Sequence, residues 1–499
     1  MSKPAKPLPD KAIKILFITS EIRPLVKTGG LADVSGALPP ALTELGVDIR
    51  ILIPGYPSVM GALNNMQLLA RITTLPGHGE VRLLGARMPD TDVPIMVVDY
   101  PAYYDRPGSP YQDEDGRDWS DNDWRFSLLS RIGAILSSHQ SPLPWRPHIA
   151  HCNDWQSGLT PAYLHYVSAP KAHSIMTIHN LAYQGIFSAN MVPLLGLPAQ
   201  SFHMQGAEYY GNFSFLKAGL FYADHITTVS PTYAKEIQSE TLGFGLQGLL
   251  FERRAQLTGI LNGIDDTFWD PARDPYIHQT FDQHNLAGKA ANKRALQLQL
   301  GLQVAPEIPL LAVVSRITHQ KGLDILLEIA PSLLDQPTQI VLLGSGEVEL
   351  EQSLLELAQE YPGKISVVIG YDEHLAHQIE AGADIFLMPS RFEPCGLNQM
   401  YSQRYGTPPV VRATGGLADT VTDATPQMIR NGSATGFVFS PLNPATFLAA
   451  VIRATTLYRD KNVWQSLQLN GMQRDFSWKK SAAEYRALYV SVAHYIDLT

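Results

Sequence analysis

Short apolar runs alternate with helical patterns along most of the chain, and this alternation limits the possible folds more than any other feature. In the first half the runs occupy residues 13–19, 48–54, 93–100, 148–152, 173–178 and 225–230. A second series begins near position 308 and comprises PLLAVVS, QIVLLG, KISVVIG, ADIFLMP, PPVVRA and GFVFS. The runs are continuously apolar, which is typical of parallel strands buried on both faces. The sequence therefore predicts an α/β protein with two doubly wound, Rossmann-like domains.

The domain boundaries follow from where this pattern begins and stops. At 499 residues the chain is too long for a single hydrophobic core. We expect a flexible N-terminal tail (1–12), an N-terminal Rossmann-like domain (13–270), a linker poor in apolar runs (271–289) and a C-terminal Rossmann-like domain (290–480). A final helix (481–499) is expected to return to the N-terminal domain.

Composition excludes several classes of protein. A net charge of -9, with both signs scattered along the chain, argues against binding to nucleic acid or to an anionic membrane. The two cysteines, Cys152 and Cys395, are far apart and fit reduced thiols better than a disulfide framework. We find neither a secretory signal nor an apolar stretch of about 20 residues that could span a membrane. These features predict a soluble, cytoplasmic protein.

The hexapeptide TGGLAD occurs twice, at 28–33 and at 414–419. Each copy lies in a loop that opens a predicted helix close to a buried strand. Paired glycines let the backbone approach a ligand closely, and the free N–H groups of the following helix favour an anion. The alternative is that Gly-Gly only makes a tight turn. If the two sheets face each other across a cleft, both loops line it, since ligands bind beyond the carboxyl ends of parallel strands.

Three further strings follow predicted strands. Arg316 and Lys321 could form a diphosphate clamp, but from this pair alone a solvated basic loop is at least as good an interpretation. Glu393 stands at a strand-to-helix turn, where a carboxylate suits the hydroxyls of a sugar attached to a phosphate. His179 ends a buried strand; such a histidine is more often structural, but its position beyond the carboxyl end adds weight to a functional role.

We expect no metal and no nucleotide hydrolysis. Asp90 and Asp92 form a DxD pair, and 113–123 is acidic, but both segments are typical of solvated loops. The sequence contains no GxxxxGK[ST] phosphate loop.

The strings KTGGLADV, HCNDW, IHNLAYQG, TVSPTYAKEI, LNGID, SRITHQKG, RFEPCGLNQ and RATGGLADT occur in this order. Together they resemble the bacterial and plant glycogen and starch synthases, which are retaining glucosyltransferases with two Rossmann-like domains facing across a deep cleft (GT-B type). The resemblance runs from about Ile13 to near the C-terminus. Two departures are small: Asn398 stands where the family usually has Thr, and LGSGE (343–347) often reads LGTGD.

The resemblance implies a donor site for ADP-glucose. Arg316 and Lys321 would neutralise the diphosphate, and Glu393 would hold glucose hydroxyls. The other implied donor-site residues are Lys27, Gly29 and Gly30 from the N-terminal domain, Asn262 and Tyr371 near the nucleoside, Cys395, Gly396 and Leu397 at the distal phosphate, and Thr414, Gly415 and Gly416 at the glucose and phosphate. Basic side chains and helix dipoles would replace a metal, so no cofactor is expected.

His179, Asp154 and Trp155 are the implied residues nearest the acceptor. His179 would touch the 6-hydroxyl of the donor sugar and offer its carbonyl to the anomeric centre, while Asp154 and Trp155 would line the acceptor side. The implied reaction is transfer of glucose from ADP-glucose to the non-reducing 4-hydroxyl of an α-1,4-glucan with retention. Because no carboxylate nucleophile is evident, same-face attack assisted by the leaving phosphate is favoured. The preference for ADP over UDP rests on the resemblance alone.

Three alternatives remain. A phosphorylase-like enzyme would need pyridoxal phosphate on a lysine and typically has a longer chain. A sucrose- or trehalose-type transferase would share Arg316, Lys321 and Glu393 but not KTGGLADV. A catalytically silent glucan-binding scaffold is disfavoured, since every expected charged site residue is present.

Overall fold

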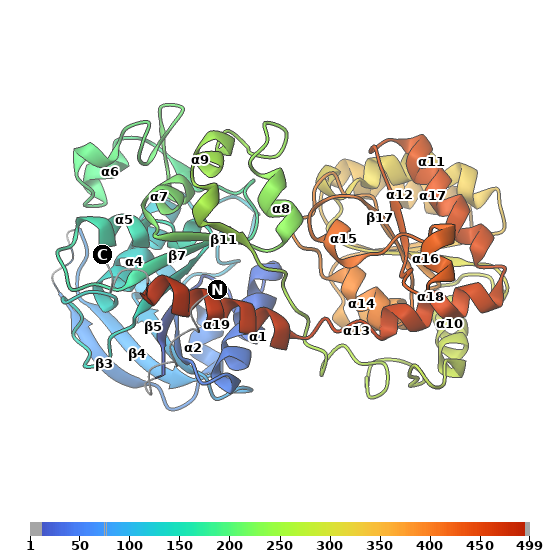
Figure 1. The fold of residues 1–499 in the computed structure, drawn as a ribbon, viewed down its shortest axis with the longest axis horizontal. Helices are drawn as coiled ribbons and strands as arrows, with labels where there is room; N and C mark the ends of the chain where they lie inside the picture. Colours follow the sequence, from blue (N-terminus) through green and yellow to red (C-terminus); the bar gives the residue numbers. More distant parts are fainter. Residues whose placement is uncertain (1–11, 74, 76, 495–499) are drawn as a thin grey trace, which may run out of the picture. The chain divides into compact units, whose positions relative to one another are not determined.

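The structure is a computed structural model that describes residues 12–73, 75 and 77–494. The expected tail, apart from residue 12, and the last five residues of the expected C-terminal helix lie outside this part. The chain divides into two units (Figure 1). Unit 1 comprises the residues up to 229 together with 234–262 and 478–499, and unit 2 comprises 230–233 and 263–477. Helix α8 (Pro231–Glu236) contains one of the divisions.

Unit 1 is built on a nine-stranded sheet of order β12-β11-β7-β6-β1-β2-β5-β4-β3. Its strands are β1 (Lys14–Ile18), β2 (Asp48–Pro54), β3 (Gln67–Ile72), β4 (Val81–Arg87), β5 (Pro94–Asp99), β6 (Ile149–Asn153), β7 (His173–Ile178), β11 (His225–Thr228) and β12 (Leu257–Gly259). The strands from β12 to β5 pair in parallel, whereas β4 and β3 add an antiparallel edge. The six strands expected in this half are all present.

Helices and a small second sheet complete unit 1. The helices are α1 (Gly30–Glu44), α2 (Pro57–Ala62), α3 (Pro101–Tyr104), α4 (Asn122–Leu136), α5 (Leu159–Tyr166), α6 (Met191–Leu194), α7 (Phe215–Tyr222), α9 (Gln247–Glu252) and α19 (Trp478–His494). The small sheet, of order β8-β10-β9, is antiparallel and consists of β8 (Ile186–Phe187), β9 (Glu208–Tyr209) and β10 (Asn212–Ser214). Nothing in the apolar pattern predicted these short strands.

Unit 2 is a fully parallel six-stranded sheet of order β15-β14-β13-β16-β17-β18. Its strands are β13 (Leu310–Val314), β14 (Gln339–Gly344), β15 (Ile365–Ile369), β16 (Ile385–Met388), β17 (Pro409–Arg412) and β18 (Phe437–Phe439). Its helices are α10 (Ala287–Gln299), α11 (Leu323–Leu334), α12 (Val348–Glu360), α13 (Glu373–Gly382), α14 (Asn398–Arg404), α15 (Gly415–Thr420), α16 (Pro426–Arg430), α17 (Pro444–Leu457) and α18 (Lys461–Met472). All six strands match the expected apolar runs.

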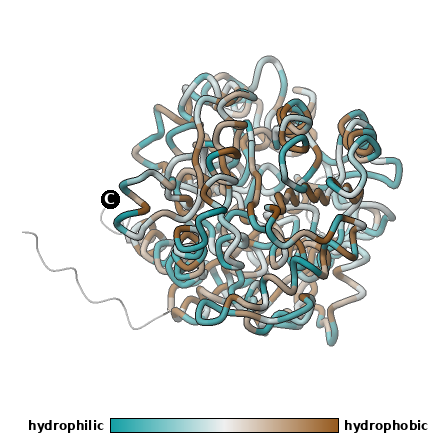
Figure 2. Tube along the Cα trace, turned by 90° about the vertical axis from the view of Figure 1, so that its right-hand side faces the viewer, coloured by the Kyte–Doolittle hydropathy of each residue, from teal (hydrophilic) through white to brown (hydrophobic). Residues whose placement is uncertain are grey.

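The sheet of unit 2 is buried on both faces. On β13, Leu311 and Val313 join a core with α11, α12 and α17, while Leu310 and Ala312 join a second core with α10 and α13. Figure 2 shows hydrophobic stretches, in brown, alternating along the trace with hydrophilic ones, in teal. Burial on two faces explains why these strands are continuously apolar in sequence.

Residues 271–289, expected as a linker, belong to unit 2. The Asp274 carboxylate is buried and accepts hydrogen bonds from His377 Nδ1 at 2.7 Å and the Tyr405 hydroxyl at 2.6 Å. Just before this segment, Trp269 stacks on the His377 ring with 3.7 Å between centroids. The segment is thus held by buried hydrogen bonds to α13 and its neighbours rather than by an apolar run, so the hydrophobic pattern does not reveal its packing.

The C-terminal helix α19 packs within unit 1, beside α1 (Figure 1). The Tyr489 hydroxyl lies 2.7 Å from His151 Nδ1, and His151 Nε2 lies 2.6 Å from the Thr177 hydroxyl. Burial lowers the pKa of His151 to about 3, which keeps the imidazole neutral near pH 7. A hydrogen-bonded chain therefore ties α19 to β6 and β7. Within the described residues, no helix has the length and apolar character needed to cross a membrane.

Candidate functional site

The first TGGLAD loop is held in place by Glu21, a residue that follows β1. The buried Glu21 carboxylate accepts hydrogen bonds through Oε2 from the N–H groups of Thr28 at 2.6 Å and Gly29 at 3.0 Å. Its other oxygen accepts a hydrogen bond from the Tyr111 hydroxyl. Glu21 was not among the predicted site residues. The sequence signal that could have identified it is the position of a carboxylate between a buried strand and a pair of glycines.

Gly29 and Gly30 face open space. A Cβ atom built on either residue meets nothing within 4 Å, and Gly29 has an extended φ of -157° that any residue can adopt. Neither local backbone geometry nor packing therefore requires glycine here. Lys27 is exposed beside this loop, with Nζ 2.9 Å from an oxygen of Asp33.

The second TGGLAD copy is packed tightly instead. Gly415 has a φ of +44°, and a Cβ there would lie 1.9 Å from the Glu393 carbonyl oxygen. A Cβ on Gly416 would lie 2.0 Å from the Cys395 carbonyl oxygen. Thr414 is buried and precedes the short helix α15. The two copies share a sequence but differ in the physical reason for their glycines.

His179 lies at the end of β7 and is oriented by its neighbours on β6. Its Nε2 lies 2.9 Å from Asn153 Oδ1, and its backbone N–H donates to Asp154 Oδ1 at 2.7 Å. The side-chain amide of Asn153 donates to the Ile18 carbonyl, so Oδ1 is the acceptor and His179 Nε2 carries the proton. Burial lowers the pKa of His179 to about 3. His179 is therefore a neutral imidazole with Nδ1 as its acceptor nitrogen.

Asp154 and Trp155 follow β6 directly. Asp154 has a positive φ of 54°, an uncommon conformation for a residue other than glycine. Burial raises the pKa of Asp154 to about 7, against the opposing effect of hydrogen bonds from the N–H groups of His179 and Asn180. The Trp155 ring packs in an aromatic cluster with centroids 4.9 Å from Phe126 and 5.8 Å from Phe187.

In unit 2, Lys321 and Glu393 form an ion pair. Lys321 Nζ lies 2.8 Å and 2.6 Å from the two carboxylate oxygens of Glu393, and the Ser390 hydroxyl donates to Oε2 at 2.9 Å. The side chains of Lys321 and Glu393 are only 17% and 7% exposed. Lys321 follows β13 and Glu393 follows β16, which are adjacent parallel strands, so their carboxyl ends bring the two residues together.

Arg391 links the same two loops a second time. Its guanidinium donates to both oxygens of Asp324 at 2.7 Å and to the His319 carbonyl at 2.6 Å. This hydrogen-bonded pair lowers the pKa of Asp324. Arg316, five residues before Lys321, is exposed, and its Nη2 lies 3.2 Å from Gln320 Oε1. Neither Arg391 nor Asp324 was singled out from sequence.

The start of α14 carries the next group of predicted residues. Gly396 has a φ of +70°, Cys395 is a buried free thiol, and Leu397 is the N-cap of α14. The N–H groups at the start of a helix have no intrahelical acceptor. Asn398 donates its side-chain amide to the Val314 carbonyl at the end of β13, which gives the departure from Thr a structural role.

The two residues expected near the nucleoside differ in their surroundings. Tyr371 is 73% exposed just beyond the carboxyl end of β15. Asn262, the last residue of this part of unit 1, is buried, and its Oδ1 has no hydrogen-bond partner among the described residues.

Each unit thus gathers predicted residues at the carboxyl ends of neighbouring parallel strands. In unit 1 these residues are Lys27, Gly29, Gly30, Asp154, Trp155 and His179, which follow β1, β6 and β7. In unit 2 they are Arg316, Lys321, Glu393, Cys395, Gly396, Leu397, Thr414, Gly415 and Gly416, which follow β13, β16 and β17. This is the edge at which ligands bind in open α/β sheets.

The acidic segments have local partners. Asp92 pairs with Arg87 at 3.0 Å, and Asp121 pairs with Arg106 at 2.6 Å. Among the described residues no group of three or more His, Cys, Asp or Glu side chains is arranged to hold a metal ion.

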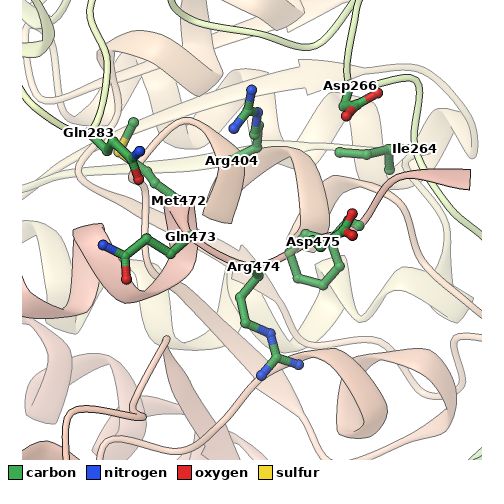
Figure 3. Close-up of a pocket in the computed structure, with 9 residues that line it drawn as sticks. Ile264, Asp266, Gln283, Arg404, Met472, Gln473, Arg474 and Asp475 are labelled. Atoms are coloured by element: carbon green, nitrogen blue, oxygen red, sulfur yellow. The ribbon is translucent and has the colours of Figure 1, made fainter. Parts of the chain in front are cut away.

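Unit 2 also contains a polar pocket away from these strand ends (Figure 3). It is lined by Ile264, Asp266, Gln283, Arg404, Met472, Gln473, Arg474, Asp475 and Phe476. Arg404 is held there by Asp270, with Nη2 3.1 Å from Oδ1. None of the predicted site residues is among the pocket's lining residues.

Both halves of the chain match known families. Residues 14–252 match the family model described as the starch synthase catalytic domain, and residues 302–466 match the model described as glycosyl transferases group 1. The glycogen synthase of Nitrosospira multiformis is 58% identical over 483 residues, covering 96% of this chain and 97% of that protein. The glycogen synthase of Nitrosomonas eutropha is 56% identical over 484 residues, covering 96% of each chain.

Solved structures agree with this similarity. The catalytic domain of starch synthase IV from Arabidopsis thaliana, bound to ADP and acarbose, has a TM-score of 0.87 and is 31% identical, covering 97% of this chain and all of that one. Sucrose-phosphate synthase from Thermosynechococcus elongatus has a TM-score of 0.58 and is 18% identical, covering 96% of this chain and 99% of that one. The second likeness concerns the fold alone.

Proposed function

The chain belongs to the glycogen and starch synthase family of glucosyltransferases, and we propose that it transfers glucose from ADP-glucose to the non-reducing 4-hydroxyl of an α-1,4-glucan. The observation that carries the proposal is the Lys321–Glu393 pair at the carboxyl edge of the unit 2 sheet. A buried cation held by a carboxylate suits a ligand that joins a phosphate to a sugar, because the ammonium attracts the phosphate and the carboxylate accepts sugar hydroxyls.

In unit 2, Arg316 and Lys321 neutralise the diphosphate of the donor. The N–H groups of Gly396 and Leu397 bind the distal phosphate at the start of α14, where Cys395 completes the turn. Glu393 accepts hydrogen bonds from the glucose hydroxyls. The remaining donor contacts in this proposal come from Tyr371 beside the nucleoside and from Thr414, Gly415 and Gly416 beside the glucose and phosphate.

In unit 1, the open space around Gly29 and Gly30 leaves room for donor atoms close to the backbone, with Lys27 adding positive charge. Asn262 offers an unpaired buried oxygen to the nucleoside. His179, neutral and fixed by Asn153, contacts the 6-hydroxyl of the donor sugar and offers its carbonyl to the anomeric carbon. Asp154 and Trp155 serve the acceptor side.

The reaction breaks the anomeric C–O bond and forms a new one to the acceptor oxygen. Negative charge grows on the departing diphosphate, and Arg316 and Lys321 stabilise it. The acceptor's 4-hydroxyl attacks from the face that the diphosphate leaves, and its proton passes to a phosphate oxygen. This route retains configuration without a covalent glucosyl-enzyme. The cations and N–H groups make a metal or other cofactor unnecessary, and we expect the reaction to occur in the cytoplasm.

The proposal is tested by incubating the purified protein with labelled ADP-glucose and glycogen. Labelled glucose should enter glycogen and be released again by an exo-acting enzyme specific for α-1,4 links. Incorporation should survive EDTA. Failure to label glycogen would contradict the function, whereas a glucosyl adduct on an Asp or Glu detected by mass spectrometry would contradict only the mechanism.

A further inference from the structure

The tip of the β9–β10 hairpin carries a tyrosine in an unfavourable position. Asn212 pairs with Tyr209, so Tyr210 and Gly211 form a two-residue turn. Their φ angles are 48° and 81°, both in the left-handed region. Such turns favour Asn-Gly, because a bulky side chain at the first position strains the backbone. Local stability therefore does not explain a tyrosine at position 210.

Packing does not explain it either. The Tyr210 side chain is 75% exposed and makes an edge-to-face contact with Tyr209, with 4.8 Å between centroids. One edge of its ring lies close to Gly245, where a Cβ would come within 2.9 Å of Cε2. The hairpin thus holds one aromatic ring at its tip with most of its surface in solvent.

The hairpin is anchored to a residue of the proposed acceptor side. Strand β10 pairs with β8, placing Phe213 opposite Phe187. The Phe187 ring lies 5.8 Å from the Trp155 ring, and a Cβ on Gly185 would lie 2.3 Å from that indole. The sheet that carries Tyr210 is therefore packed directly against Trp155.

Hydrogen bonds hold the base of the hairpin. The Tyr209 hydroxyl donates to the Phe244 carbonyl at 2.6 Å, and the Gln184 amide donates to the same carbonyl at 2.9 Å. The Glu208 carboxylate accepts the Gly211 N–H at 2.7 Å across the turn. The position of Tyr210 is thus fixed from both ends of the turn.

We propose that Tyr210 is a platform on which a glucosyl unit of the acceptor glucan stacks, away from the unit that receives glucose. The proposal rests on the proposed function, which supplies the glucan. A pyranose ring has a flat face of C–H groups that suits an aromatic ring, and its hydroxyls suit the exposed Asn212 beside it. The negative charge of the Glu208 carboxylate at the turn disfavours a phosphate-bearing ligand. The exposed area of one aromatic ring is far smaller than the area that a stable protein–protein interface buries.

The test compares Tyr210→Asn with Tyr210→Phe by affinity electrophoresis in gels containing glycogen and by steady-state kinetics. Asparagine suits the turn and removes the ring, whereas phenylalanine keeps the ring. In Tyr210→Asn the dissociation constant and the KM for glycogen should each rise about five-fold, the size of effect expected for one stacking contact. The KM for ADP-glucose should stay the same and Tm should stay the same or rise. Tyr210→Phe should match the wild type.

Unchanged glycogen retardation in Tyr210→Asn would overturn the platform, and so would a large fall in Tm, because it would make Tyr210 a structural residue. If the wild type is a dimer in solution and Tyr210→Asn is a monomer, a second copy of the chain is the occupant, which would also overturn the platform. The electrophoresis needs no turnover. Wild-type protein that binds glycogen through Tyr210 but transfers no glucose would contradict the proposed function and leave the platform standing.

Discussion

Lys321 Nζ contacts both oxygens of the Glu393 carboxylate, at 2.8 Å and 2.6 Å, although the two residues are 72 positions apart in the chain. The contact joins the loops after β13 and β16. It orients a cation and a carboxylate together at the edge where the proposal puts the diphosphate and the glucose. Each side chain therefore has a structural partner and a proposed ligand.

Removing one member of this pair should damage both stability and activity. Lys321→Ala leaves the Glu393 carboxylate buried without its cation, which should cost about 3 kcal/mol of unfolding free energy. Activity should fall on the order of 10² to 10³ in kcat. Urea unfolding and steady-state kinetics measure the two effects.

A double variant separates these effects. Lys321→Met with Glu393→Gln removes both charges, so stability should recover most of the loss while activity stays low. The control is Lys461→Ala, whose exposed pair with Glu307 at 3.3 Å should be worth less than about 1 kcal/mol. A double variant with wild-type activity would show that the pair is only structural.

Replacing a glycine by alanine should have different effects in the two TGGLAD copies. Gly29→Ala places its Cβ in open space, so Tm should be unchanged while the KM for ADP-glucose rises. Gly416→Ala forces a Cβ into the Cys395 carbonyl, which should cost about 1–3 kcal/mol and lower Tm. Gly248→Ala is the matched control, because a Cβ there also meets open space but lies in α9. This variant should neither lower Tm nor raise the KM for ADP-glucose. A fall in Tm for Gly29→Ala would contradict the conclusion that this position has room for a side chain.

Asp154 should make the protein less stable as pH rises. Burial raises the pKa of Asp154 to about 7, whereas an aspartate in the unfolded chain titrates near pH ~4. Between these values the folded protein holds a proton that the unfolded chain has released, so the unfolding free energy falls with rising pH. Asp154→Asn keeps an acceptor for the His179 N–H and removes this titration. Relative to wild type, the unfolding free energy of this variant should therefore increase between about pH 4 and about pH 7 in urea titrations and level off above. A difference that does not change with pH would contradict this prediction.

His151 should act in the opposite sense. Burial lowers the pKa of His151 to about 3, while the unfolded histidine titrates near ~6.5. As pH falls through this window the unfolded chain binds more protons, so stability contributed by the neutral ring is lost. Thermal unfolding of His151→Gln should be less acid-sensitive than that of wild type, and exposed His284→Gln should behave as wild type. Equal acid sensitivity in all three proteins would count against this prediction.

Each of the twelve apolar runs in the sequence is a strand in the structure. These runs are easy to recognise because a strand buried on both faces is apolar at nearly every position. Strand β3 is mostly exposed at a sheet edge and the hairpin strands are very short, so neither has such a run. The packing of residues 271–289 depends on Asp274 meeting His377 and Tyr405, which are distant in sequence.

The site residues also divide into those with a local signal in the sequence and those whose role depends on distant residues. Charged residues just after strands could be singled out by position, as Lys321 and Glu393 were. Glu21 and Arg391 stand in similar positions, but their roles, like that of Asn153, depend on hydrogen bonds to other parts of their units, which position alone does not reveal. The hexapeptide repeat predicted two similar loops, yet only the structure distinguishes an open pair of glycines from a packed pair.

Glucosyl transfer from ADP-glucose to a glucan is the reaction proposed for this protein. Its most direct test measures kcat/KM for labelled ADP-glucose and UDP-glucose side by side, with the purified protein and glycogen as acceptor. Incorporation from ADP-glucose should be at least about ten-fold more efficient than from UDP-glucose, a difference of roughly 1.4 kcal/mol in transition-state binding. Equal or better use of UDP-glucose, or no incorporation from either donor, would contradict it.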